Sequence, residues 1–172
     1  MLDLYAYTGG FAVQAAAGGA KRVLAVDSSA PALALAQKAA ARNGVAGSCE
    51  FRKDDAFDAL EALAAGNERF EVVIADPPHF ARSKKDVPAA LKGYRKLART
   101  AAALVRPGGF MFIASCSHNV TAEAFGLEVA GGISRAGRTG RILRAAGAGA
   151  DHPVHPLLPE TAYLKTLTLQ LD

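Results

Sequence analysis

Residues 70–80 read Phe-Glu-Val-Val-Ile-Ala-Asp-Pro-Pro-His-Phe, and this stretch decides the fold. Its first half is short, apolar and rich in β-branched and aromatic residues, which is typical of a strand buried in a parallel sheet. Residues 110–117, Phe-Met-Phe-Ile-Ala-Ser-Cys-Ser, repeat this pattern. Open α/β sheets bind ligands at the carboxyl ends of such strands. We therefore expect Asp76 and Cys116 to project into one site from neighbouring strands.

Short apolar runs alternate with helix-like segments on both sides of this stretch. Strands are predicted over residues 2–5, 22–26, 49–53, 70–75, 110–115, 141–146 and 162–170. Helices are predicted over residues 11–18, 31–43, 56–65, 88–105 and 121–130. This alternation predicts an α/β fold with a Rossmann-like, mostly parallel, doubly wound sheet of seven strands. The last two strands, joined by a proline-rich loop, are expected to form an antiparallel pair at its edge.

Polar residues and glycines mark the expected element ends. Thr8 is a candidate N-cap for the first helix, Ser28 or Ser29 for the second, and Asp54-Asp55 for the third. Pro107-Gly108-Gly109 is predicted to be a turn that leads into the fifth strand. Residues 131–150, rich in Gly, Ala and Arg, are expected to be mainly loop.

Composition restricts the class of protein. The chain has 172 residues, of which 51% are hydrophobic, and this suits one globular domain over residues 1–172. No apolar run approaches the roughly 20 residues that span a bilayer, so we expect no membrane partner. A secretory signal is not evident, and we expect Cys49 and Cys116 to be free thiols in a cytoplasmic protein. The net charge of +4 permits a nucleic-acid partner without requiring one.

Acidic residues at the predicted strand ends indicate a nucleoside ligand. Asp27 ends the second strand, where a carboxylate can accept hydrogen bonds from both hydroxyls of a ribose. Taken alone, Asp27 is equally well explained as an exposed strand-end acid. The preceding turn, residues 7–11, lacks the G-x-G-x-x-G set that holds a pyrophosphate. This makes a nucleotide dehydrogenase the least favoured alternative.

S-adenosylmethionine has no phosphate and fits this series of residues. Its methionine end would contact backbone groups of the glycine turn, its ribose would contact Asp27, and its adenine amino group would contact Asp55. Asp54 is the alternative adenine contact, although an acid at this position is more often a helix cap. The predicted cofactor-binding residues are Asp3, Tyr7, Thr8, Gly9, Gly10, Phe11, Asp27, Ser28, Asp54, Asp55, Ala56 and Asp76. No metal is predicted.

A set of motifs resembles one known family. In chain order they are Asp3-Leu4-Tyr5-Ala6-Tyr7-Thr8-Gly9-Gly10-Phe11, Asp54-Asp55-Ala56-Phe57, Asp76-Pro77-Pro78-His79-Phe80, Ser115-Cys116-Ser117, Asp151-His152-Pro153 and Tyr163-Leu164-Lys165. The chain resembles, over essentially its whole length, the catalytic domain of the bacterial rRNA large subunit methyltransferase I group. The resemblance implies a class I methyltransferase fold and 5-methylcytosine formation in 23S rRNA with S-adenosylmethionine. The resemblance also implies that relatives carry an N-terminal RNA-binding PUA domain, which we expect to be absent from residues 1–172, and it allows a homodimer.

The residues support cytosine chemistry independently. Carbon 5 of cytosine is a poor nucleophile, and addition of a thiolate to carbon 6 makes it enamine-like. Cys116 is the predicted nucleophile, although a lone strand-end cysteine is more often a small buried hydrophobe. Asp76 is predicted to bind N3 and the exocyclic amine of the base. The base that removes the carbon 5 proton cannot be assigned from the sequence.

The substrate-side predictions concern the loop after Asp76. Pro77 and Pro78 would fix this loop, and Phe80 would stack on the flipped base or else pack in the core. Lys84 and Lys85 would contact phosphates at the rim. Further basic residues, either a phosphate-contacting rim or a solvated helix face, are Arg82, Lys92, Arg95, Lys96 and Arg99, with a second group at Arg135, Arg138, Arg141 and Arg144.

Two other functions stay open. Asp-Pro-Pro-aromatic loops also serve methylation of amino groups on adenine or guanine, and relatives that make 7-methylguanine lack the Ser-Cys-Ser motif. Neither reaction needs Cys116. The other alternative is a domain that binds the cofactor but is silent outside a larger assembly.

Overall fold

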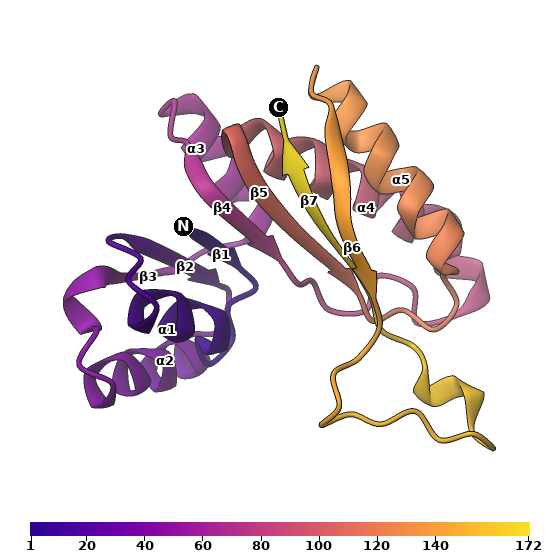
Figure 1. The fold of residues 1–172 in the computed structure, drawn as a ribbon, viewed down its shortest axis with the longest axis horizontal. Helices are drawn as coiled ribbons and strands as arrows, with labels where there is room; N and C mark the ends of the chain where they lie inside the picture. The colour runs from indigo at the N-terminus through magenta and orange to yellow at the C-terminus, as the bar shows by residue number, and fades with distance from the viewer.

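The computed structural model describes all 172 residues as one seven-stranded sheet with helices on both faces (Figure 1). The strands are β1 (Leu2–Leu4), β2 (Val23–Asp27), β3 (Cys49–Lys53), β4 (Phe70–Ala75), β5 (Val105–Ser115), β6 (Gly140–Ala146) and β7 (Lys165–Leu171). The helices are α1 (Gly10–Ala17), α2 (Ala30–Arg42), α3 (Ala56–Ala65), α4 (Val87–Leu104) and α5 (Ala122–Arg135). No helix is both long and apolar enough to cross a membrane.

The strand order is β3-β2-β1-β4-β5-β7-β6. β1 to β5 pair in parallel, and β7 is antiparallel to both β5 and β6. The predicted doubly wound sheet with an antiparallel pair at its edge is therefore confirmed. The antiparallel strand itself, β7, lies second from the edge. The reversal of order between β1 and β4 is the point at which such sheets bind ligands.

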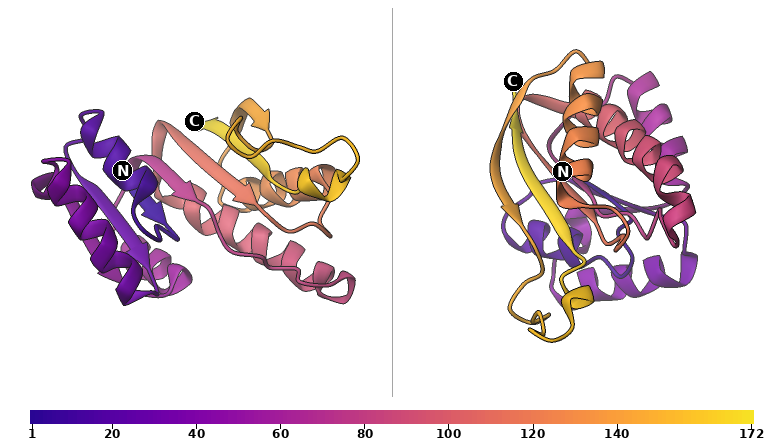
Figure 2. Two further views of the ribbon diagram at one scale, coloured as in Figure 1. Left: turned by 90° about the horizontal axis from the view of Figure 1, so that it is seen from below. Right: turned by 90° about the vertical axis from the view of Figure 1, so that its right-hand side faces the viewer.

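The two faces of the sheet are covered unequally. α1 and α2 pack over β2 and β3 on one face, and α3, α4 and α5 cover the opposite face (Figures 1 and 2). The main core contains 29 buried residues and lies under α3, α4 and α5, while α1 covers a second cluster of only five. α4 lies at the centre of the larger core, where Tyr94 and Leu97 are completely buried. This core fixes the ends of β4 and β5.

The helix N-caps match the sequence predictions for the second and third helices but not for the first. Gly9, and not Thr8, precedes α1, with a φ of 81° that glycine adopts at little cost. Ser29 rather than Ser28 caps α2, since its Oγ accepts from the Ala32 amide at 3.3 Å. Asp55 caps α3 by accepting from Phe57 and Asp58.

The second half of the chain contains more regular structure than predicted. Residues 107–109 belong to β5, where a register shift opposite residues 70–72 absorbs the extra residues of the strand. A Cβ on Gly109 would lie 2.8 Å from the Glu71 carbonyl oxygen, so this close approach of β5 to β4 needs a glycine. α5 extends to Arg135 and β6 follows within five residues, so that much of the predicted loop region is helix or strand. β7 begins at Lys165 rather than at residue 162.

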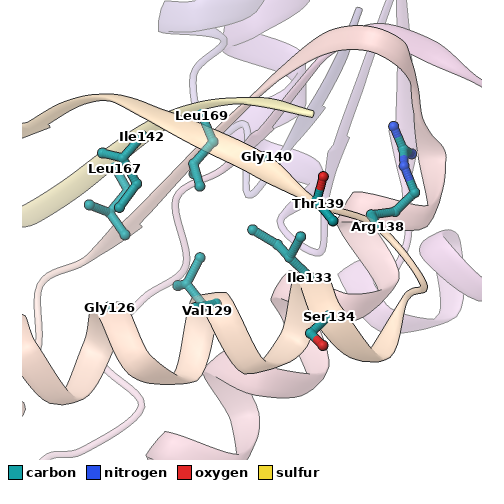
Figure 3. A pocket seen from close by; sticks show the side chains of 11 residues that line it. Gly126, Val129, Ile133, Ser134, Arg138, Thr139, Gly140, Ile142, Leu167 and Leu169 are labelled. Carbon is teal, nitrogen blue, oxygen red and sulfur yellow. The ribbon is translucent and has the colours of Figure 1, made fainter. Parts of the chain in front are cut away.

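A groove of about 310 Å³ runs between α5 and strands β7 and β6 (Figure 3). Val129, Ile133, Leu167 and Leu169 line it, and Arg138 extends away from these side chains in the view of Figure 3. The Arg138 guanidinium instead donates to the Ala102 and Val105 carbonyls. This groove therefore offers apolar contact without reactive groups.

The contact between α4 and α5 provides a test of the packing. A Cβ on Gly132 would lie 2.6 Å from the Arg95 carbonyl oxygen and 2.7 Å from the Ala98 Cβ. Because alanine there must push the helices apart, we expect Gly132→Ala to lower the free energy of unfolding by about 1–3 kcal/mol. Gly126 in the same helix has open space around it, so Gly126→Ala should raise that free energy by about 0.5–1 kcal/mol. Urea unfolding of both variants checks this, and equal effects would contradict the packing.

Candidate active site

The parallel strands end at one edge of the sheet and bring the predicted residues together there. Leu4 of β1 lies beside Val26 of β2 and beside Ala75 of β4, and Ala75 lies beside Ile113 of β5. The segments that follow these positions therefore leave the sheet side by side. The loop over residues 147–164, between β6 and β7, protrudes at the same end (Figure 1).

Asp27 is held by backbone groups on both sides. Its Oδ2 accepts from the Tyr7 amide and its Oδ1 accepts from the Ser29 amide, both at 2.8 Å. Each carboxylate oxygen has further lone pairs, so the fixed carboxylate can still accept from two hydroxyl groups. Asp27 thus has a defined orientation, unlike a freely rotating surface acid.

The turn between β1 and α1 is conformationally unusual. Tyr5 has φ 61° and Tyr7 has φ 49°, and both values lie in the left-handed region that glycine normally occupies. Gly9 completes the turn, and a Cβ there would lie 2.8 Å from the Ala36 Cβ. Strained backbone of this kind persists where the surroundings hold it, and it concentrates at ligand sites. Tyr7 and Phe11 are exposed beside this turn.

Asp3 is buried beneath the turn with an unused hydrogen-bond acceptor. The side chain is 1% exposed, and its Oδ2 has no hydrogen-bond partner. Burial, with smaller contributions from the charges of Asp76 and Asp27, raises the pKa of Asp3 from 3.8 to about 7. A backbone hydrogen bond from Ala12 acts in the opposite direction. A cationic donor such as an α-ammonium group would satisfy this oxygen.

Asp54 and Asp55, which follow β3, make different bonds in the structure. Asp54 pairs with Arg52 at 2.5 Å and accepts from the Asp55 amide, so it is not the cap of α3. Asp55 uses its Oδ1 for the cap and leaves Oδ2 without an assigned bond. Ala56, the first residue of α3, is buried beneath them. Asp55 therefore makes two capping bonds through Oδ1 and keeps Oδ2 available as an acceptor.

Cys116 lies against the Asp-Pro-Pro loop. Its thiol donates to the Pro77 carbonyl oxygen at 3.7 Å, and both Cys116 and Asp76 are half-buried. Burial raises the pKa of Asp76. Burial and the charge of Asp76 raise the pKa of the Cys116 thiol, whereas a backbone hydrogen bond and the charge of Lys165 lower it. The predicted pair is thus brought together, with Pro77 buried and Pro78 exposed between them.

A buried hydroxyl network explains why a serine stands on each side of Cys116. The Ser115 hydroxyl donates to the Tyr94 hydroxyl oxygen at 2.8 Å, and the Tyr94 and Ser117 hydroxyls lie 3.0 Å apart. The Ala81 amide also donates to Ser117 Oγ at 3.3 Å. The network therefore ties α4, the Asp-Pro-Pro loop and the Cys116 segment together.

Phe80 packs against the buried Tyr94 side chain. Its ring centroid lies 4.8 Å from that of Tyr94, and a Cβ on Gly93 would come within 3.1 Å of the ring. Phe80 thus packs against the core, the second of the two roles considered from the sequence. Lys84 and Lys85 are exposed in the short turn before α4.

Three aromatic rings near Cys116 make contacts that the sequence did not predict. The rings of His79 and His118 stack with centroids 5.8 Å apart, and His118 lies 4.8 Å from Tyr163. These rings come from the loops after β4 and β5 and from the loop before β7. Their separation in sequence leaves no local pattern that would have revealed the contact.

The basic residues that formed two groups in the sequence partly converge in space. A groove of about 210 Å³ between α4 and α5 is lined only by the cations Lys92, Arg95, Lys96, Arg99 and Arg135, and we call it the basic groove. Arg95 pairs with Glu128, and Lys96 pairs with Glu61 at 3.4 Å. The other three form no ion pair. Arg138 does not join the groove, because it binds backbone carbonyls and Asp172.

Comparison with known proteins identifies the family of this chain. Residues 1–121 match the model of the family described as Conserved hypothetical protein 95. The chain belongs to this family. It is also 37% identical over 166 residues to "Ribosomal RNA large subunit methyltransferase I" of Salmonella arizonae, and equally to that of Salmonella newport. These matches confirm the resemblance inferred from the motifs.

The match covers 96% of this chain but 41% of the curated relatives, so the chain spans about two fifths of their length. Among solved structures, that of SMU.776 complexed with SAH superposes with a TM-score of 0.85 and 26% identity, over 98% of this chain and 44% of that one. TrmN from Thermus thermophilus, at 23% identity and a TM-score of 0.65 over 98% of this chain and 42% of that one, shares the fold. The fold is that of class I methyltransferases.

Asp3 gives a prediction about stability. Its pKa is about 7 in the folded chain and about 4 in the unfolded chain, so the folded chain keeps a proton that the unfolded chain releases between these values. Stability should therefore fall as the pH rises from about 4 to about 7, by up to roughly 4 kcal/mol. Asp3→Asn should remove most of this loss and unfold at higher urea concentration than the parent chain at pH 8. The exposed Asp151→Asn is the control, and an unchanged pH dependence in Asp3→Asn would contradict the assignment.

Proposed function

We propose that the chain is an S-adenosylmethionine-dependent RNA methyltransferase domain that acts on rRNA, most specifically at carbon 5 of cytosine in 23S rRNA through Cys116. The observation that carries the proposal is the position of the Cys116 thiol against the Asp-Pro-Pro loop, next to the strand-end acids. The names of the curated relatives support an rRNA substrate, and the SAH complex of SMU.776 supports the cofactor.

The chain's own residues fit S-adenosylmethionine better than a dinucleotide. Asp27 would hold the ribose hydroxyls with a carboxylate already oriented by two amides. The free Oδ2 of Asp3 would accept a hydrogen bond from the methionine ammonium group. Asp55 would accept from the adenine amine, and residues 7–11 with Ser28 and Asp54 would complete the site. When bound, S-adenosylmethionine supplies an electrophilic methyl group on a positively charged sulfur.

Cys116 and Asp76 would divide the chemistry on the base. The Cys116 thiolate forms a bond to carbon 6 of cytosine, and the electron pair of the carbon 5–carbon 6 double bond becomes available at carbon 5 for the methyl group. Because burial raises the pKa of Asp76, its carboxyl group is suited to share a proton with N3 as the charge develops. Loss of the carbon 5 proton then restores the double bond and releases Cys116.

A fluorinated substrate tests the nucleophile. With S-adenosylmethionine and an rRNA transcript containing 5-fluorocytosine, the final proton cannot leave, so the chain should remain joined to RNA at Cys116. Mass spectrometry of the digested adduct locates the bond. Cys116→Ala should give no adduct, and Cys49→Ala should give as much as the parent chain. Methyl transfer without an adduct would instead favour amino-group or guanine methylation, and loss of both would favour the silent domain.

We also propose that the basic groove and the exposed Lys84 and Lys85 contact RNA phosphates. Neutralising Lys92, Arg99 and Arg135 to glutamine should weaken RNA binding and reduce the slope of log K against log salt by about 2, because each phosphate contact contributes roughly 0.7 on single strands. Lys21, Lys38 and Arg42 lie outside the groove, so their triple glutamine variant controls for net charge. Fluorescence anisotropy from 50 to 200 mM salt measures both, and equal losses in the two variants would mean that only overall charge matters.

A further inference from the structure

Lys165 lies at the beginning of β7, directly opposite Ser115 in the antiparallel pairing with β5. Its Nζ donates to the Ser117 carbonyl oxygen at 2.7 Å and to the Val120 carbonyl oxygen at 2.8 Å. These bonds enclose the turn that follows Cys116. The turn has one backbone bond of its own, from the Val120 amide to the Ser117 carbonyl at 3.1 Å. Lys165 is therefore a structural part of the segment that carries the thiol.

The bonding of Lys165 favours its charged form. The ammonium group has three N–H donors, and two carbonyl oxygens accept from it. Burial lowers the pKa of Lys165, while the negative charge of an ionised Cys116 opposes this effect. An ammonium group held by two fixed carbonyls is thus kept beside the thiol even though the site is half-buried.

Groups of both signs surround Cys116. Cys116 interacts electrostatically with Asp76 at the end of β4 and with Lys165 at the start of β7. It also interacts with the Tyr94 hydroxyl of α4, and His118 is two residues away along the chain. Asp76 opposes ionisation of the thiol, and Lys165 is the cation that favours it. A nucleophilic cysteine reacts as the thiolate, so this cation is placed where the proposed reaction needs one.

We propose that Lys165 is a positioning residue that fixes the turn after Cys116 and stabilises the Cys116 thiolate through its charge. The proposal rests on the proposed function for its purpose, although the interaction itself can be measured without RNA. In this step the thiol releases one proton to solvent, and no proton leaves Lys165. The thiolate then supplies the electron pair for the bond to carbon 6.

Alkylation by iodoacetamide, read by mass spectrometry of the separate cysteine peptides, tests this interaction. For each thiol, the pH midpoint of the rate reports the pKa, and the limiting rate at high pH reports access to the sulfur. We expect Lys165→Met to shift the Cys116 midpoint upward by about one pH unit, so that the rate at pH 8 falls roughly tenfold. Lys165→Arg should keep the midpoint near that of the parent chain.

Cys49 is an internal reference in the same molecules, because it lies at the start of β3 and not at the site. Its profile should be identical in all variants. If Lys165→Met does not fold, Lys165→Gln replaces it as the neutral variant. A changed limiting rate with an unchanged midpoint would overturn the electrostatic role, since a purely structural lysine alters access alone. An unchanged Cys116 profile would overturn the proposal altogether.

The fluorocytosine experiment separates this inference from the proposed function. A midpoint shift without any RNA adduct in the parent chain would support the interaction between Lys165 and Cys116 and contradict the cytosine chemistry. An adduct in the parent chain with no midpoint shift would support the chemistry and contradict the role of Lys165.

Discussion

The parallel pairing of β4 with β1 on one side and with β5 on the other is the constraint on which the candidate site depends. Leu4, Ala75 and Ile113 lie in one row across these strands, so the segments after them leave the sheet at the same level. A slip of two residues would move Cys116 by about 7 Å relative to Asp76. That displacement is more than twice a hydrogen-bond length, and it would separate the thiol from the Asp-Pro-Pro loop.

Packing behind the sheet keeps this register. Tyr94 is fully buried between the Asp-Pro-Pro loop and the Cys116 segment, and its hydroxyl lies within 3.0 Å of both Ser115 Oγ and Ser117 Oγ. Buried hydroxyls left without partners cost about 1–3 kcal/mol each, so these three groups stabilise one another in one arrangement. The two serines therefore fix the position of Cys116 and do not themselves bond to its thiol. Lys165 secures the opposite side of the same segment.

Much of the fold and the list of candidate residues could be predicted from the sequence. Apolar runs over residues 70–75 and 110–115 have the period and length of buried strands, and the residues just after them necessarily share an edge. Asp27, Asp76 and Cys116 could be located in this way. Helix caps were harder, because Thr8 and Gly9 are both reasonable N-cap residues and only the backbone geometry decides between them.

The remaining features depend on tertiary contacts that no local pattern encodes. Phe80 could stack on a base or pack on Tyr94, and the two roles have the same sequence signature. Lys165 sits in an alternating strand, and its direction became clear only from the bonds to Ser117 and Val120. The basic groove joins Arg135 of α5 to cations of α4 because the Gly132 face of α5 packs closely against α4, which charge counting cannot detect.

We propose that the acids at the strand ends together form one site for S-adenosylmethionine. Isothermal titration calorimetry of the purified chain with S-adenosylmethionine, beside NAD at the same concentrations, tests it most directly. We expect one site per chain for S-adenosylmethionine and no binding of NAD. Binding should be at least tenfold weaker in Asp27→Ala, because the ribose contacts that are lost contribute about 1.4 kcal/mol. Binding of NAD in place of S-adenosylmethionine, or binding of S-adenosylmethionine that is unaffected by Asp27→Ala, would contradict it.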